Sequence, residues 1–421
     1  MSATGQRNGY VYLTILMTSL IVASLALAAV NVVHQFAAQQ SESVDFRKAL
    51  LAANSGLELA IARINADPNW RSTHVNNTDI PATNISGCSV SYRLVDTDGD
   101  LADSPFDRCT LQVRATCGDI NYRWQATVAP DGPAMNCLLN SVTAGSDVNI
   151  IDDGVLNSDG PVVSSVRVMT GVNGFVVANC SSPDNSGNIY GTVSSLLAAP
   201  QIPGSEVFEY YKRVGTDIPV TSLPISSGSD RVIRGHLLSE NVNTITGGIN
   251  SKGIYVLDLQ GANLDISITR VHGTLVLINC GIDIIVQPSV LWEPAVNNYP
   301  ILLCDRDLKL RLQRPAFNEF SGGRNLNPPE LPYRGLSDAN TSTYLPCLMR
   351  GLIYATGKVQ LDDVNSDVIL QGCIVCGGML EGNGDMYVHY RDIYAQHPPP
   401  GFRIPNIMKI VPGSVKHIAT P

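Results

Sequence analysis

Charged residues are scarce in this chain of 421 residues, because Asp, Glu, Lys and Arg together make up only 15% of it. An average soluble domain carries about a quarter. The formal net charge is −9, and the Lys and Arg residues form no cluster. Since nucleic-acid binding requires a concentrated basic surface, the sequence argues against nucleic acid as a partner.

The longest stretch without any charge lies near the N-terminus, between Arg7 and Glu42. Residues 11–33 within it are almost wholly apolar, and their few polar side chains are small enough to hydrogen-bond to a helix backbone. At about 1.5 Å per residue, a helix of this length crosses a hydrocarbon layer of about 30 Å. We therefore predict a membrane span within a long helix that covers residues 10–67.

A helical pattern continues beyond the apolar run. Apolar residues recur there at spacings of three, four and seven, namely Leu50, Ala53, Leu57, Ala60, Ile61 and Ile64. Pro68 ends the pattern, because proline disfavours helix in the residue before it. Gly56 costs such a helix about 1 kcal/mol, which indicates a close approach to another backbone. The sequence predicts one unbroken helix whose apolar face packs with the helices of other subunits.

The start of the chain also carries a distinctive arrangement of residues. A short polar leader, residues 1–9, ends in Gln6-Arg7-Asn8-Gly9, Tyr10 follows, and ALLAANSGLELAIARI continues the helix after the apolar run. This arrangement resembles the N-terminus of type IV pilins and type II secretion pseudopilins, above all PilX-like minor pilins and the large minor pseudopilin. The resemblance implies processing between Gly9 and Tyr10. Thr14 stands where major pilins carry glutamate, which implies a minor subunit.

Two other interpretations of the apolar run stay open. Ala26-Leu27-Ala28 offers the cleavage site of an ordinary secretory signal peptide, and the run can also be a generic single-pass anchor. Neither explains why the helical pattern continues to Ile64. Arg7 and the amino terminus precede the span, and a large polar mass follows it, which favours a cytoplasmic N-terminus. We expect a single-pass inner-membrane protein whose bulk is periplasmic or at the cell surface.

Residues 68–130 predict a small antiparallel sheet that packs on the exposed half of the helix. Three alternating segments, GCSVSYRLVDTDGDL, CTLQVRAT and NYRWQATV, are the predicted strands. Four aspartates that could together hold calcium lie at and just beyond the end of the first segment, namely Asp96, Asp98, Asp100 and Asp103. Their glycine is misplaced for an EF-hand loop, and Asp-Gly is common in hairpins. A solvated turn is the favoured interpretation, and we predict no metal or other cofactor.

The ten cysteines permit disulfides in an exported chain. Cys109 and Cys117 flank one alternating segment and could join neighbouring strands. Cys373 and Cys376 have the C-x-x-C spacing of redox and zinc sites, but no second Cys or His pair accompanies them. Residues three apart on a strand point to opposite faces. We therefore predict that both are buried and act as small apolar residues.

Helices almost vanish after a linker at residues 131–133. Short apolar runs separated by Gly, Asn and Asp follow, and some repeat after 20 residues, as from Gly253 to Gly273, or after 21, as from Gly351 to Gly372. This period is typical of a parallel β-helix, whose coils bury an inner apolar column only when they stack. An immunoglobulin-like sandwich is the alternative.

The predicted fold is thus an α+β, pilin-like module of a long helix and a small antiparallel sheet, followed by an all-β, parallel β-helix domain over residues 134–400. Residues 313–347 are rich in Pro, Gly and Asn and are predicted to form a long loop suited to a partner contact. Residues 401–421 are predicted to be a C-terminal tail.

Enzymatic activity is not expected. The sequence contains no G-x-S-x-G, H-E-x-x-H or P-loop motif. Asp362-Asp363, with His272 as helper, is the nearest approach to a polygalacturonase carboxylate pair, but adjacent strand residues face opposite ways. Asp305-Arg306-Asp307 with Lys309 is the nearest approach to the acidic cluster and basic residue of a lyase.

These observations predict a membrane-anchored, minor pilin- or pseudopilin-like structural subunit of a bacterial type IV pilus or type II secretion system. The exported β domain would serve assembly or adhesion. The expected partners are the membrane, other subunits through the N-terminal helix, and a surface ligand such as a polysaccharide. The alternative is a tethered cell-surface β-helix protein that binds or cleaves polysaccharide.

Overall fold

The computed structural model describes residues 7–418 with the exception of 106, 197, 227–229, 313–315 and 362–367. The chain divides into two compact units. The first comprises Met1–Pro130 together with Asn406–Pro421, and the second comprises Asp131–Pro405. The C-terminal end of the chain therefore belongs to the first unit.

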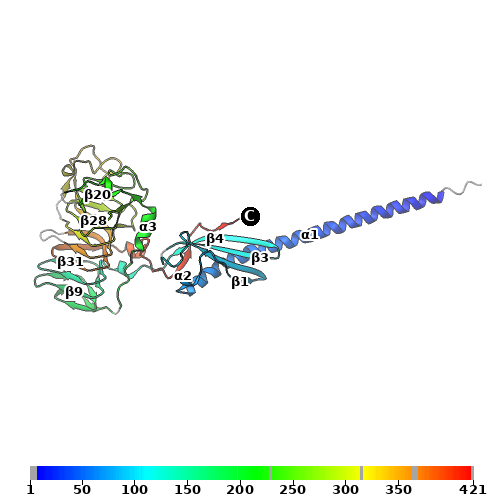
Figure 1. Cartoon of the computed structure of the whole chain (residues 1–421), viewed down its shortest axis with the longest axis horizontal. Coiled ribbons are helices and arrows are strands. Elements are labelled where there is room, and N and C mark those ends of the chain that lie inside the picture. Colours follow the sequence, from blue (N-terminus) through cyan, green and yellow to red (C-terminus); the bar gives the residue numbers. More distant parts are fainter. Residues whose placement is uncertain are drawn as a thin grey trace, which may run out of the picture. The chain divides into compact units, whose positions relative to one another are not determined.

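A single helix, α1 (Arg7–Ala66), begins the first unit and is drawn in blue in Figure 1. It continues without a break past the end of the apolar run. It ends directly before Asp67-Pro68, where proline cannot continue the hydrogen-bond ladder. Every side chain from Tyr10 to Val44 is exposed, and Ala49 is the first fully buried residue. The predicted unbroken helix is confirmed.

The second half of α1 packs on the sheet of its own unit. Its buried residues are small or branched, namely Ala49, Ala52, Ala53, Leu57, Ala60 and Ile64. Leu50 and Ile61, predicted on the same stripe, are only half-buried. A Cβ atom at Gly56 would lie 2.6 Å from Val90 Cγ1 and 2.7 Å from Val113 Cγ1. The close approach predicted at Gly56 is therefore made to sheet side chains and not to another backbone.

The sheet has three strands more than the sequence predicted. Four of its strands form an antiparallel meander: β1 (Ile80–Ile85), β2 (Cys88–Val95), β3 (Cys109–Cys117) and β4 (Ile120–Pro130). Two more, β33 (Met408–Ile410) and β34 (Lys416–His417), pair with β4. Asn65 on α1 anchors this return by accepting from the amide of Met408 at 2.7 Å and donating to its carbonyl at 3.0 Å. The prediction of a C-terminal tail over residues 401–421 was wrong.

One disulfide joins β2 to β3, between Cys88 and Cys117, whose Cα atoms are 4.6 Å apart. The two residues face each other because Ser89 pairs with Thr116 in the antiparallel register. Cys109, at the opposite end of β3, is a buried free thiol. The expectation that these flanking cysteines join neighbouring strands is therefore confirmed for Cys117 and wrong for Cys109.

Removing this disulfide is expected to destabilise the first unit. The bond closes a loop with a sequence separation of 29, for which loop-closure entropy corresponds to about 2–4 kcal/mol. Cys88→Ser/Cys117→Ser should therefore accelerate hydrogen exchange in peptides from β2 and β3, as measured by mass spectrometry. Reductant should bring the wild type to the same rates and leave the variant unchanged. Identical exchange in oxidised wild type and variant would contradict this expectation.

The second unit is a parallel β-helix, and the sandwich alternative was wrong. Its strands form a 17-stranded and a 9-stranded sheet (Figure 1). The larger sheet contains β5 (Val142–Ala144), β7 (Val155–Ser158), β8 (Val162–Ser164), β10 (Phe175–Val177), β11 (Cys180–Ser182), β13 (Asn188–Tyr190), β14 (Val193–Ser195), β15 (Thr216–Asp217), β17 (Leu237–Leu238), β18 (Ile254–Asp258), β20 (Thr269–His272), β21 (Thr274–Ile278), β23 (Val290–Glu293), β24 (Pro300–Cys304), β28 (Leu348–Ala355), β30 (Val368–Cys376) and β32 (Asp385–Tyr390). The smaller sheet contains β6 (Val148–Ile150), β9 (Arg167–Thr170), β12 (Asp184–Ser186), β16 (Arg231–Arg234), β19 (Leu264–Ser267), β22 (Ile284–Val286), β25 (Leu308–Leu310), β29 (Val359–Leu361) and β31 (Leu380–Gly382). The short helices of the chain are α2 (Trp70–Thr73) in the first unit, and α3 (Val207–Val214) and α4 (Ile393–Gln396) in the second.

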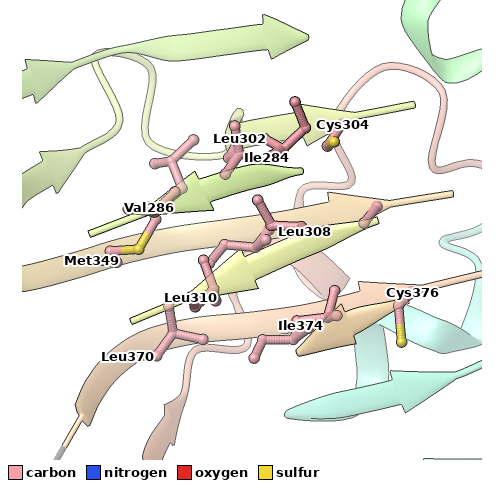
Figure 2. Close-up of a cluster of buried hydrophobic side chains, with 14 of the residues drawn as sticks. Ile284, Val286, Leu302, Cys304, Leu308, Leu310, Met349, Leu370, Ile374 and Cys376 are labelled. Carbon is pink, nitrogen blue, oxygen red and sulfur yellow. The ribbon is translucent and has the colours of Figure 1, made fainter. Parts of the chain in front are cut away.

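The repeat predicted from the sequence is the coil of this β-helix. Ile254 pairs with Thr274, and Gly351 pairs with Gly372, in parallel register. Successive coils stack their inward side chains into one apolar core, to which strands of both sheets contribute (Figure 2). Figure 2 shows this for the labelled residues Ile284, Val286, Leu302, Cys304, Leu308, Leu310, Met349, Leu370, Ile374 and Cys376.

The coils do not stack in chain order. The first coil of the unit, β5–β6–β7, pairs with the last, made of the end of β30 with β31 and β32. Coils over residues 142–195 continue the stack from there in one direction, and coils over residues 216–390 continue it in the other. The sequence predicted the coils but not this order, because their periodicity does not say which coils are neighbours.

The segment predicted as a projecting loop, residues 313–347, is folded against the coils from residue 316 onward. It contains β26 (Phe317–Asn318) and β27 (Tyr344–Leu345), which pair with each other. Arg270, only 4% exposed, donates from Nη1 to the carbonyl of Leu326 at 2.9 Å. Glu319, wholly buried, accepts from the amide of Leu326 at 2.8 Å. Arg270 therefore fixes the segment to the β-helix, and Glu319 holds the segment together from within. Its role in a partner contact stays a prediction.

Candidate membrane and assembly helix, and an acidic loop

The first half of α1 has the properties of a membrane span. Within Tyr10–Ala66 an apolar window has a mean hydropathy of 2.4, and none of that window is buried. Its hydroxyl groups return to the helix backbone: Thr14 Oγ1 donates to Tyr10 O at 2.7 Å and Thr18 Oγ1 to Thr14 O at 2.8 Å. Such bonds lower the cost of polar atoms in hydrocarbon. The helix is therefore suited to anchor the chain in a membrane by a single pass.

Contacts with the rest of the first unit begin where the apolar run has ended. An ion pair within α1, between Asp45 and Lys48 one turn apart, marks this point, with Lys48 Nζ 3.9 Å from Asp45 Oδ1. Phe46 packs edge-on against Tyr122 of β4, with ring centroids 5.6 Å apart. N-terminal to this point, no described residue of the first unit buries an α1 side chain. An apolar surface of this length requires lipid or a partner to cover it.

The surface available to other subunits differs from the one expected. The stripe that includes Leu57 and Ile64 was predicted to pack with other helices, but the sheet of its own unit buries it. The apolar side chains of α1 that stay exposed and turn away from the sheet are those of the first half, together with Val44 and Leu51, whereas the exposed Phe46 lies against Tyr122. Leu51 is 65% exposed although it lies beside the buried Ala52. Any helix–helix contact outside the membrane must therefore use this opposite face.

The backbone of the predicted processing site is helical, because Gly9 and Tyr10 both lie within α1. The structure does not test whether the chain is cleaved there. Processing between these two residues stays a prediction.

An acidic loop joins β2 to β3, and it assembles a different set of carboxylates from the one predicted. Oxygen atoms of Asp96, Asp103 and Asp107 all lie within 4.8 Å of one another. Asp98 and Asp100 are engaged in turns, because their Oδ1 atoms accept from the amides of Asp100 and Ala102 at 3.1 and 2.9 Å. The structure thus brings Asp96 and Asp103 together, leaves Asp98 and Asp100 aside and adds Asp107.

Sequence reasoning missed Asp107, although a spacing signal was present. A calcium loop of about 12 residues takes ligands from positions 1, 3, 5, 7, 9 and 12. Counted from Asp96, position 12 is Asp107. The sequence prediction included only the first four aspartates of the loop, and so it left out Asp107.

The environment of the acidic loop disfavours the charged form of its clustered carboxylates. Burial raises the pKa of Asp96, and the charges of neighbouring carboxylates raise it further. Burial likewise raises the pKa of Asp107, with a contribution from Asp103. Arg71 opposes both shifts, but its Nη atoms donate to the carbonyls of Leu101 at 3.0 Å and Asp107 at 2.6 Å. The arginine therefore holds the backbone of the loop.

The lyase-like group of the second unit is built into turns of the β-helix. Asp305 accepts from the amide of Asn279 at 2.5 Å, and Asp307 accepts from the amide of Lys358 at 2.7 Å. Lys309 forms a 2.6 Å ion pair with a different aspartate. These contacts fix neighbouring coils to each other, so the role that they show for these residues is structural.

The polygalacturonase-like group is not assembled among the described residues. His272 Nδ1 lies 2.8 Å from a carboxylate oxygen of Glu240. Asp362 and Asp363 lie outside the described residues. The absence of enzymatic activity stays a prediction.

The C-x-x-C pair is buried, as predicted. Cys376 belongs to the coil core, with Sγ 3.7 Å from the carbonyl oxygen of Thr143. Cys373 is also fully buried but lies outside that core cluster. Burial raises the pKa of Cys376 to about 12 and raises that of Cys373 well above its usual value. Because a thiolate is required for redox or zinc chemistry, these thiols are structural.

Comparison with known proteins gives limited information. No protein-family model and no curated protein matches the sequence. Among similar solved structures is a crystal structure of the competence-associated pilin ComZ from Thermus thermophilus, at 11% identity and a TM-score of 0.34, which covers 88% of this chain and 97% of that chain. Another is a crystal structure of an ice binding protein from an Antarctic Biological Consortium, at 10% identity and a TM-score of 0.24, covering 62% of this chain and 93% of that chain. Similarities at these TM-scores carry no functional argument.

Proposed function

We propose that this chain is a membrane-anchored minor pilin- or pseudopilin-like subunit that enters a bacterial filament through α1. The observation that supports the proposal best is the division of α1 into two halves. One half is apolar and uncovered from Tyr10 to Phe36, and the other is seated on a small antiparallel sheet. A helix of this kind can rest in lipid and later exchange lipid for the equivalent helices of other subunits.

The second unit suggests what such a subunit would present. The β-helix is large, rigid through its stacked core, and exported in this proposal together with the small sheet. A bulky unit of this kind restricts how many neighbours a subunit can have in a filament. The proposal therefore places the chain as a minor component, with a role in assembly or adhesion and its bulk in the periplasm or at the cell surface.

The mature N-terminus distinguishes this proposal from its rivals. A filament subunit is expected to begin at Tyr10 after removal of the leader, whereas a secreted or generically tethered β-helix protein with a signal peptide would begin after Ala28. Intact-mass and N-terminal peptide analysis of the protein purified from membranes of its native host reads this directly. A start at Tyr10 supports the proposal, and a start at Ala29 contradicts it.

A further inference from the structure

The acidic loop contains a carboxylate whose burial is uncompensated. Asp96 is only 6% exposed, and its Oδ1 accepts from the amide of Thr97 at 2.7 Å. Its Oδ2 is buried and has no hydrogen-bond partner within the described part of the chain. A buried charged oxygen without a partner is strongly unfavourable in a native structure. A cation or a water molecule bound at the loop would satisfy it.

Neighbouring positive charge does not fill this role. Arg71 is the cation whose charge acts on Asp96 and Asp107, but both of its Nη atoms are used by backbone carbonyls. No ion pair within 4.0 Å joins it to Asp96, Asp103 or Asp107 among the residues described. Five aspartates lie between residues 96 and 107, against Arg71 and Arg108, so the loop keeps a local excess of negative charge.

The separation of the oxygens allows them to share one cation. Calcium binds oxygen at about 2.3–2.6 Å, so two oxygens on opposite sides of it are about 4.6–5.2 Å apart. Magnesium binds at about 2.0–2.1 Å, which limits the same separation to about 4.2 Å. The ligand oxygens of Asp96, Asp103 and Asp107 fall within 4.8 Å of one another. Oxygens within this distance of one another can share one calcium ion without rearrangement, and the flexible geometry of calcium suits an irregular loop better than the strict octahedron that magnesium demands.

We propose that the loop between β2 and β3 binds one calcium ion through Asp96, Asp103 and Asp107. The ion satisfies the unpartnered oxygen of Asp96 and neutralises the carboxylates that raise one another's pKa. Waters and loop carbonyls complete the coordination, since calcium takes six to eight oxygens. Leu101 occupies the position at which EF-hand loops have glycine, so the site is not an EF-hand copy. This inference does not rest on the proposed function.

The expected effect of calcium is local ordering of the acidic loop. Because Arg71 ties the carbonyls of Leu101 and Asp107 to α2, an ion at the carboxylates fixes the loop from its other side. The dissociation constant is expected on the order of 10⁻⁴–10⁻³ M, the weak end of the range for calcium sites in proteins. Calcium at saturating concentration should slow hydrogen exchange in residues 96–107.

The test uses the full chain in detergent, stripped with chelator and dialysed, and titrated with calcium chloride or magnesium chloride in a calorimeter. Wild type should bind one calcium per chain, with magnesium at least ten-fold weaker. Asp96→Asn and Asp107→Asn should each weaken calcium binding at least ten-fold. Asp119→Asn, an exposed acid in the neighbouring β3–β4 turn, is the matched control and should bind like wild type.

Hydrogen exchange keeps the test independent of folding defects. Peptides from β3 and β4 in the variants should retain wild-type protection without calcium, which shows that the sheet is intact. Absence of calcium binding in wild type would overturn the proposal. So would binding of equal strength in Asp96→Asn, in Asp107→Asn and in wild type, because the ion would then lie elsewhere.

Discussion

Replacing Ile21 and Leu25 together with arginine is expected to remove the chain from the membrane. Both side chains lie in the apolar half of α1 and are exposed, by 55% and 64%. They are four residues apart, so the two charges lie on one face of the helix. Each arginine near the centre of a span costs about 2.5–3.5 kcal/mol on insertion scales, and the pair therefore shifts insertion by several orders of magnitude.

Carbonate extraction of membranes followed by immunoblotting measures this effect. Wild type should resist extraction, whereas Ile21→Arg/Leu25→Arg should appear in the soluble or aggregated fraction. Gln39→Arg/Gln40→Arg is the matched control, because these exposed residues follow the apolar run, and it should behave like wild type. Extraction-resistant association of the Ile21/Leu25 variant would show that α1 does not anchor the protein.

Gly56→Val is expected to have the largest effect on the first unit of any single substitution in α1. The new Cβ would lie 2.6 and 2.7 Å from methyl groups of Val90 and Val113, well inside van der Waals contact. Both valines are buried on central strands, so neither can move aside without disturbing the sheet. Overpacking of this kind costs about 1–3 kcal/mol, and the two additional methyl groups of valine add to it.

The matched control for this substitution is Ser55→Val. Ser55 is the preceding residue of the same helix and is exposed, so the same side chain there changes only helix propensity, by a few tenths of a kcal/mol. Hydrogen exchange of β2 and β3 peptides should be faster in Gly56→Val than in Ser55→Val. Equal protection in the two variants would mean that α1 does not pack on the sheet at Gly56.

Local patterns in the sequence were sufficient to predict the main elements. The uncharged run and the spacing of Leu57, Ala60 and Ile64 predicted α1. A helix can be predicted in this way because it depends on contacts between residues that are close in the sequence. The 20-residue repeat from Gly253 to Gly273 predicted the β-helix, because each coil repeats the same local requirement.

What the sequence did not predict depends on contacts between distant residues. The return of Met408 to Asn65 joins residues 343 apart and has no local signal. The disulfide from Cys88 to Cys117 depends on the register of β2 against β3, which alternation alone does not specify. The acidic loop was recognised, but its convergence on Asp107 requires the path of the backbone between the strands.

The most direct test of the proposed function is photo-crosslinking from the exposed face of α1 in living cells. A photoreactive amino acid at Leu51, on the face turned away from the sheet of its own unit, should form adducts in cells that assemble the filament. Mass spectrometry should place the adducts in the N-terminal helix of another filament subunit. The same probe at Val172, a 92% exposed residue of the second unit, serves as the control and should not react with that helix. If Leu51 forms no protein adduct in assembling cells, or reacts only with proteins that lack such a helix, then α1 is an anchor and not an assembly element.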